Sequence, residues 1–347
     1  MKVTVIGANS AFSVGNYKNA VPVEKLKSLI PELTKKFADS DASEKKIEAY
    51  LESYIEQQKE YLYAPAWQSN FLIEFDQKNI RGDKESPFRL VLDFGSDVRH
   101  ALAYVGLDFK DIDAYYVSHP HDDHIGGVEG IALKTFFNPF FTKKKIAWLD
   151  GENIIDKITY KAAKGQLYKV PKESKPLMYG HRDILKALWQ AAEPGLLTLQ
   201  QVREVTLDTY FNVVEMVENE PLVLKDGKRT WHAYIVLSMH VVSGDSTMPS
   251  YGLMFESDET IIFFPTDTQF MVPPQLRGHY MKSDYIFHDT ETSPFPSGVH
   301  TRIEELKTLP ADLKKKMILY HYDATVVPDV EKGEFYDIAY SGNTYEF

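Results

Sequence analysis

Three histidines and two aspartates fall within six consecutive positions of this chain, and four of them, His119, His121, Asp123 and His124, form the pattern H-x-H-x-D-H. The apolar segment Ala114–Ser118 precedes them, so we expect a strand that ends where the polar residues begin. Side chains on a loop beyond a strand end are held by the sheet yet open to solvent, as a catalytic site requires. The first two histidines can face one metal ion, and the aspartate and the third histidine can face a second. The pattern predicts a metal site rather than a polar loop.

Two adjacent metal ions need more ligands than this motif supplies. The chain has no cysteine, so histidine and carboxylate side chains must provide them. Three later polar residues each close an apolar, strand-like segment, namely His240, Asp267 and His321. A polar residue at that position is costly unless something at the sheet edge uses it. Taken singly, each of these residues could equally be a metal ligand or an ordinary hydrogen-bonded histidine or turn aspartate. Together with the motif, we interpret all three as candidate ligands.

Strand-like segments occur in two blocks, each followed by helical segments. We expect strands at "KVTVIGA", "NFLIEF", "RLVLDFG" and "DAYYVSH", then at "WHAYIVLSMH", "YGLMFES", "TIIFFPTD", "DYIFHD" and "MILYHYD". The helical pattern is clearest at His181–Glu193, with shorter helices expected at Asp97–Val105 and Thr301–Leu309. Two strand blocks with helices between them predict an α/β fold in which two sheets pack together and helices lie outside.

The chain is long enough for one large core, since 44% of its 347 residues are hydrophobic. We expect a single domain over residues 1–347, with a helical insertion at about 21–62 and an extended segment at about 150–225. The insertion carries one apolar stripe, from Ile47 to Leu62. The insertion could pack on the domain, form a lid over the site or make a dimer contact, and the sequence leaves all three roles open.

A binder of long nucleic acids usually shows a basic face, and this chain, with a net charge of −11, shows none beyond short runs such as Thr142–Ile146 and Leu313–Met317. No apolar run reaches the roughly 20 residues of a membrane helix, and the first residues do not have the layout of a signal peptide. We therefore expect a cytoplasmic protein that does not enter a membrane.

On these residues the chain resembles the metallo-β-lactamase superfamily over nearly its whole length. The resemblance implies an αββα sandwich. It also implies that Asp93, in "VLDFG", orients the motif loop and that Asp267 bridges two metal ions. The implied ligands are His119, His121 and His240 for the first ion, and Asp123, His124 and His321 for the second.

Further segments resemble the phosphodiesterase branch of this superfamily, which includes the tRNA 3′-processing endonuclease and cyclic-nucleotide phosphodiesterases. They are "QSNFLIEF", "MHVVSGDSTMPSYGLMF", "FFPTDT" and "FHDTETS" followed by "GVHT". The branch uses a carboxylate and a histidine to protonate the leaving group, which implies Asp289 and His300, although Asp289 stands where glutamate is usual. Pro265 and Thr266 also depart from the small residues of the branch.

The resemblance implies a phosphodiesterase with a binuclear metal site, in which a metal-bridging hydroxide attacks phosphorus. It implies that Asp123 orients the attacking group or accepts its proton, and that His300 donates a proton to the leaving group. The imidazole and carboxylate ligands favour zinc, with manganese or iron left open. The short interval from His240 to Asp267 has no room for the basic arm with which the endonuclease holds tRNA. We therefore expect a small phosphodiester substrate such as a cyclic nucleotide, and a homodimer as in related proteins.

Three alternatives remain open at this point. One is an RNA 3′-end endonuclease acting on short RNA. Another is a lactone or thioester hydrolase, for which an acid at His300 matters less. The last is a non-catalytic scaffold that keeps the fold.

Overall fold

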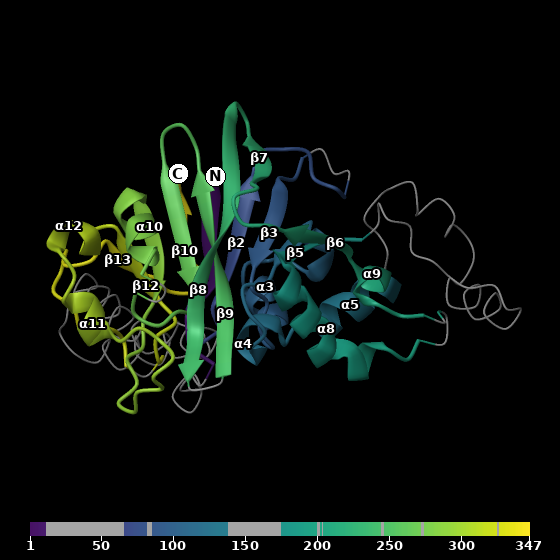
Figure 1. Ribbon diagram of the computed structural model, residues 1–347. Coiled ribbons are helices and arrows are strands. Elements are labelled where there is room, and N and C mark those ends of the chain that lie inside the picture. Colours follow the sequence, from purple (N-terminus) through teal and green to yellow (C-terminus); the bar gives the residue numbers. More distant parts are fainter. Residues whose placement is uncertain are drawn as a thin grey trace, which may run out of the picture. The chain divides into compact units, whose positions relative to one another are not determined.

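Two seven-stranded mixed sheets pack face to face in the part of the chain described by the computed structural model (Figure 1). The described residues are 1–11, 66–81, 85–137, 175–199, 202, 204–243, 246–271, 274–324 and 326–347. The first sheet has the order β14-β1-β2-β3-β4-β5-β6 and the second β13-β12-β11-β10-β9-β8-β7. The strands of the first sheet are β1 (Lys2–Gly7), β2 (Asn70–Phe75), β3 (Phe88–Leu92), β4 (Ala114–Tyr116), β5 (Leu177–His181), β6 (Asn212–Met216) and β14 (Thr344–Glu346). Those of the second are β7 (Leu222–Asp226), β8 (Arg229–Ser243), β9 (Ser246–Glu256), β10 (Ile261–Thr266), β11 (Tyr285–Asp289), β12 (Met317–Tyr320) and β13 (Asp337–Ile338).

Helices lie outside the two sheets, so the predicted αββα sandwich is confirmed (Figure 1). The helices that follow strands of the first sheet are α3 (Val98–Tyr104), η1 (Phe109–Asp111), α4 (Asp122–Ile125), α5 (Val128–Phe137), α8 (Arg182–Leu196) and α9 (Leu207–Tyr210). Those that follow strands of the second sheet are α10 (Leu276–Lys282), α11 (Ile303–Lys307) and α12 (Ala311–Lys314). Helix α8 contacts β5 and β6, and α10 contacts β10.

The core between the sheets is aromatic. The ring of Phe71, in β2 of the first sheet, meets three rings of the second sheet edge-on, with centroid distances of 5.2 Å to Phe264, 5.5 Å to Phe287 and 4.9 Å to Tyr320. Edge-to-face aromatic pairs at such distances add to the energy of burial. They fix β2 against β10, β11 and β12, the strands whose ends carry candidate ligands.

The predicted strands and helices lie where the sequence indicates, but their ends differ: some elements are shorter than predicted and others, such as β8 and β9, are longer. The segment Asp113–His119 forms a strand only over Ala114–Tyr116, and the helix expected at Asp97–Val105 runs from Val98 to Tyr104. The helix expected at His181–Glu193 continues to Leu196, past Pro194. The short strands β13 and β14 have no counterpart among the predictions, because they are too brief to show a period of two.

Part of the predicted extended segment at about 150–225 belongs to the first sheet, since β5, α8 and β6 lie within it. Residues 138–174 lie outside the described residues. The predicted helical insertion at 21–62, with its apolar stripe, also lies outside them. The chain divides into two units, Met1–Ser13 with Trp67–Phe347 and Val14–Ala66, and the single domain stays a prediction.

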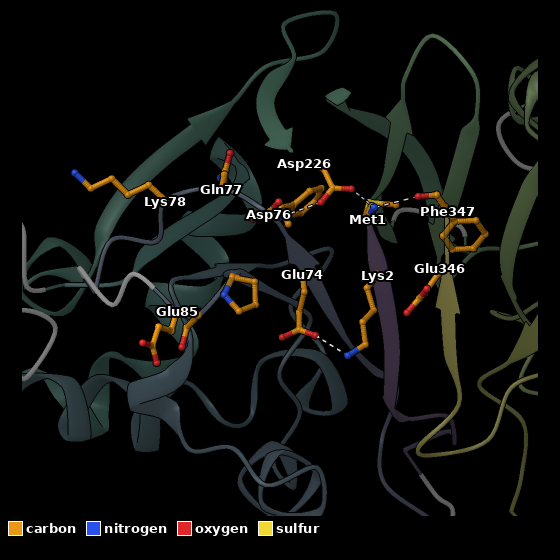
Figure 2. A pocket seen from close by; sticks show the side chains of 13 residues that line it. Met1, Lys2, Glu74, Asp76, Gln77, Lys78, Glu85, Asp226, Glu346 and Phe347 are labelled. Atoms are coloured by element: carbon orange, nitrogen blue, oxygen red, sulfur yellow. Dashed lines mark hydrogen bonds and ion pairs between the residues drawn. The ribbon is translucent and has the colours of Figure 1, made fainter. Parts of the chain in front are cut away.

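A hollow of about 1060 Å³ lies at the start of β1 (Figure 2). Two ion pairs lie in it: the ammonium group of Met1 contacts Asp226, and Lys2 lies 3.0 Å from Glu74. None of the clustered histidines lines it, and the opposite end of β1 leads to the candidate metal centre. Size alone therefore does not mark the functional site. Among the described residues no helix is long and apolar enough to cross a membrane.

Candidate metal centre

The candidate ligands converge at one edge of the sandwich, where parallel strands of both sheets end. In the first sheet β3 and β4 are parallel, and in the second sheet β10, β11 and β12 are parallel. His119 and its motif follow β4, Asp267 follows β10, and His321 follows β12. The carboxyl ends of parallel strands are the usual place for a ligand site in open α/β sheets.

Three histidines form the first cluster, and their ring nitrogens lie within 4.8 Å of one another. Nε2 of His240 is 2.9 Å from Nδ1 of His121, and Nε2 of His119 is 3.3 Å from the same atom. His240 lies on β8 beside a register shift between Met239 and Val241. Such a bulge re-aims a side chain, here toward the two motif histidines.

The second cluster joins Asp123, His124, Asp267 and His321, all buried and within the same 4.8 Å limit. Oδ2 of Asp267 lies 3.0 Å from Nε2 of His124 and 3.2 Å from Nε2 of His321. It also lies 3.8 Å from Nε2 of His119, in the first cluster. Asp267 is therefore placed between the two clusters, as a bridging carboxylate would be.

The backbone is strained at three positions beside the site. Asp93, Thr266 and His321 have φ values of 59°, 59° and 63°, in the left-handed region that non-glycine residues rarely adopt. Each follows or ends a strand, so the strain turns the chain sharply at the sheet edge. Strain of this kind clusters at functional sites. Thr266 carries the additional penalty of a β-branched side chain in this conformation.

The electrostatics of the two clusters differ. Burial lowers the pKa of His240 to about 3 and holds the pKa of His119 well below its usual value, so both rings are neutral and able to bind a cation. Burial also lowers the pKa of His124, but three carboxylates, Asp267 foremost, outweigh it and raise that pKa well above its usual value. The second cluster thus carries a proton where a metal ion would bind.

Two supporting contacts hold the ligand rings. Oδ2 of Asp93 lies 2.7 Å from Nδ1 of His124, and both oxygens of Asp93 accept hydrogen bonds from Ser118 at 2.8 and 2.9 Å. Nδ1 of His240 lies 3.1 Å from the carbonyl oxygen of Val299. Contacts of this kind fix the tautomer of a metal-binding histidine. Asp93 was expected to orient the loop. Ser118 and the Val299 carbonyl were not predicted, because a common serine and a backbone oxygen give no sequence signal.

The predicted acid pair lies beside both clusters. Nδ1 of His300 is 3.2 Å from Oδ2 of Asp289 and 3.7 Å from Oδ2 of Asp267. Burial lowers the pKa of His300, but these two carboxylates outweigh it and raise the pKa to about 9. Asp289 is itself held by the backbone N–H of Thr268 at 3.3 Å. A histidine that carries a proton at neutral pH can donate it to a leaving group.

The donor set fits a pair of divalent cations. Oδ1 of Asp267 is fully buried and makes no hydrogen bond, which is costly unless a cation takes its lone pairs. In the first cluster, imidazole nitrogens face one another at hydrogen-bond distance. At most one nitrogen of each facing pair can donate a hydrogen bond, so the nitrogens left with lone pairs are available to a cation. The structure thus brings together all seven candidate ligands and both candidate acid residues. Their individual roles remain proposals.

Solved structures of other proteins share this fold. YhfI from Bacillus subtilis, a metallo-β-lactamase fold protein, matches with a TM-score of 0.51 and 16% identity, covering 99% of each chain. A diphosphatase from the PhnP family matches with a TM-score of 0.55 and 15% identity, covering 100% of this chain and 97% of that one. These matches show that the chain has the metallo-β-lactamase fold, as predicted, and the clustered imidazole and carboxylate donors lie at one edge of that fold.

The family is narrower still. The family model described as Anti-Pycsar protein Apyc1 matches residues 64–169 and 161–345, so the chain belongs to that family. The relative of this name in Paenibacillus harenae is 26% identical over 258 residues, which are 74% of this chain and 88% of the relative. The two matched segments of the family model span the positions of all seven candidate ligands.

Proposed function

We propose that this chain hydrolyses a small phosphodiester, with a cyclic nucleotide as the substrate class. The observation that carries the proposal is the position of His300, which lies within 3.7 Å of Asp267 and is held by Asp289. The alkoxide that leaves phosphorus is a poor leaving group, so its departure benefits from a proton donor. In lactone hydrolysis the oxyanion of the tetrahedral intermediate helps to expel the leaving alkoxide, so a proton donor matters less. A protonated histidine next to the metal centre therefore favours phosphodiester hydrolysis over lactone hydrolysis.

The strands between the third histidine and the bridging aspartate support a small substrate. His240 lies on β8 and Asp267 follows β10, and β8, β9 and β10 are successive antiparallel neighbours. The described residues of this interval belong to these strands and to the turn at 257–260, so none of them forms an arm that could hold a folded RNA. The diphosphatase of similar fold is consistent with chemistry at phosphorus.

The proposed centre would bind two divalent cations: His119, His121 and His240 would hold one, Asp123, His124 and His321 would hold the other, and Asp267 would serve both. We propose zinc, because imidazole and carboxylate donors suit it. When bound, the cations supply positive charge that stabilises the anionic phosphate and lowers the pKa of water. Asp123, which lies 3.3 Å from His321, orients the attacking water or accepts its proton. His300, whose Nδ1 is held by Asp289 at 3.2 Å, carries the proton that the leaving oxygen takes. We also retain the predictions of a cytoplasmic location and a homodimer.

A substrate panel tests the proposal. Metal-loaded protein is incubated with 2′,3′- and 3′,5′-cyclic nucleotides, short RNA and a lactone, and the products are measured by chromatography. We expect cyclic nucleotides to be cleaved fastest, with no product from the Asp267→Ala variant or after chelation. The Asp122→Asn variant is the matched control, because Asp122 is exposed and belongs to neither cluster. Cleavage of the lactone in preference to every phosphodiester would contradict the proposal.

A further inference from the structure

A second, smaller hollow of about 130 Å³ opens beside the metal centre. His300 and His321 of the centre line it, together with residues that include Ser10, Phe295 and Asp323. Ligand pockets for whole small molecules usually measure several hundred cubic ångströms. This hollow can therefore seat only the reacting end of a nucleotide, and the rest of the substrate must lie along its rim.

The rim is formed by residues 292–300, which connect β11 to α11. This segment is pinned at both ends: the backbone N–H of Glu291 donates to the carbonyl of Thr301 at 2.8 Å, and the side chain of Gln269 donates to the carbonyl of Gly298 at 2.7 Å. Inside it, the N–H of Ser297 donates to Oε1 of Glu291 at 2.7 Å. The loop is thus fixed relative to the metal centre.

Phe295 lies on this loop and is 84% exposed, the highest value among the large hydrophobic side chains of the described residues. The next highest, Met281, is 55% exposed. Single exposed hydrophobic residues are common and need no explanation. Phe295 differs because it also lines the hollow together with two histidines of the centre. An aromatic ring held in water at the rim of a reaction site is suited to stack on another flat ring.

We propose that Phe295 is the platform on which the nucleobase of the substrate stacks while its phosphate lies at the metal centre. The inference rests on the proposed function and deepens it, because it requires a substrate that carries a base. Every base has a π-face, so stacking on one phenylalanine is strong yet tolerant of base identity. Discrimination between bases would have to come from polar groups elsewhere on the rim.

The test compares substrates with and without a base. Wild type and the Phe295→Ala variant are assayed on a 3′,5′-cyclic nucleotide and on methyl riboside 3′,5′-cyclic phosphate, which has the same reacting group and no base. We expect the variant to lose roughly tenfold or more of kcat/KM on the nucleotide. Its activity on the base-free substrate should stay within about twofold of wild type. The Phe295→Trp variant should retain nucleotide activity, and Phe295→Leu should behave like Phe295→Ala.

Equal losses on both substrates, or full nucleotide activity in Phe295→Leu, would overturn the inference. A change of oligomeric state in Phe295→Ala would also overturn the inference, because it would show that the ring forms a contact between copies of the chain. Binding of a nucleoside 5′-monophosphate and of ribose 5-phosphate, measured by calorimetry, separates this inference from the proposed function. Suppose that wild type cleaves neither cyclic phosphate. Stacking is still supported if wild type binds the nucleoside monophosphate more tightly than ribose 5-phosphate and Phe295→Ala loses this difference in affinity. Equal affinity of wild type for the two ligands refutes stacking.

Discussion

Asp93 and His124 form a fully buried pair, with 2.7 Å between Oδ2 of the carboxylate and Nδ1 of the imidazole. The pair links β3 to the motif that follows β4, and it leaves Nε2 of His124 facing Asp267 at 3.0 Å. One carboxylate therefore sets which nitrogen of His124 is available to a metal ion. This relationship leads directly to the first prediction.

Replacing Asp93 with asparagine should weaken metal binding at the second cluster by about 10- to 100-fold. Asparagine keeps the size and an acceptor oxygen but loses the charge that fixes the His124 ring. Metal affinity is measured by competition with a chelator of known affinity. The Asp122→Asn variant, which changes an exposed neighbouring carboxylate, should bind as wild type does. Unchanged affinity in Asp93→Asn would show that Asp93 does not support the metal.

Metal binding should release protons and become tighter as the pH rises. In the metal-free protein the carboxylates around His124 raise its pKa well above the usual value, so the ring is protonated at neutral pH and must lose a proton to bind. Affinity should therefore fall as the pH drops below that pKa, by up to tenfold per pH unit for one proton. Calorimetry in buffers of different ionisation enthalpy counts the protons released. A heat of binding that does not depend on the buffer would contradict the prediction.

The His300→Gln variant should lose activity on substrates with poor leaving groups far more than on activated ones. An alkoxide leaving group benefits from general acid catalysis by about 10²- to 10⁴-fold, whereas p-nitrophenolate leaves readily without a proton. Rates on a cyclic nucleotide and on bis(p-nitrophenyl) phosphate are compared at saturating metal. Equal losses on both substrates would exclude the acid role for His300. The Asp289→Asn variant should show the same selectivity to a smaller degree, since Asp289 contacts His300 at 3.2 Å.

Thr266 gives a prediction about stability. Its hydroxyl contacts the carbonyl of Pro265 at 2.6 Å and the hydroxyl of buried Ser250 at 2.8 Å, which offsets the strain of φ 59°. Glycine at this position relieves the strain but loses these bonds, so Thr266→Gly should stay within about 1 kcal/mol of wild type. Thr266→Val keeps the strain and leaves Ser250 with one partner fewer, at a cost of about 1–3 kcal/mol. Urea unfolding of the metal-free proteins measures both, and a valine variant as stable as the glycine variant would contradict this account.

The sequence by itself determined the architecture and the set of candidate ligands. Apolar strand segments in two blocks predict two sheets, since burial of a strand depends on its own composition. Histidine and aspartate at the ends of such strands are detectable for the same reason: each of His119, Asp267 and His321 closes an apolar run. Local patterns of this kind need no knowledge of distant contacts.

Only the tertiary structure decided how these residues meet. The contact of His321 with Asp123, at 3.3 Å, joins residues that lie far apart in the chain, and the bulge that turns His240 toward His121 depends on pairing between β8 and β9. The Val299 carbonyl beside His240 and the exposed ring of Phe295 at the rim carry no sequence signal at all. Their positions follow from the packing of the two sheets, because side-chain geometry at a shared edge is set by strand register and not by composition.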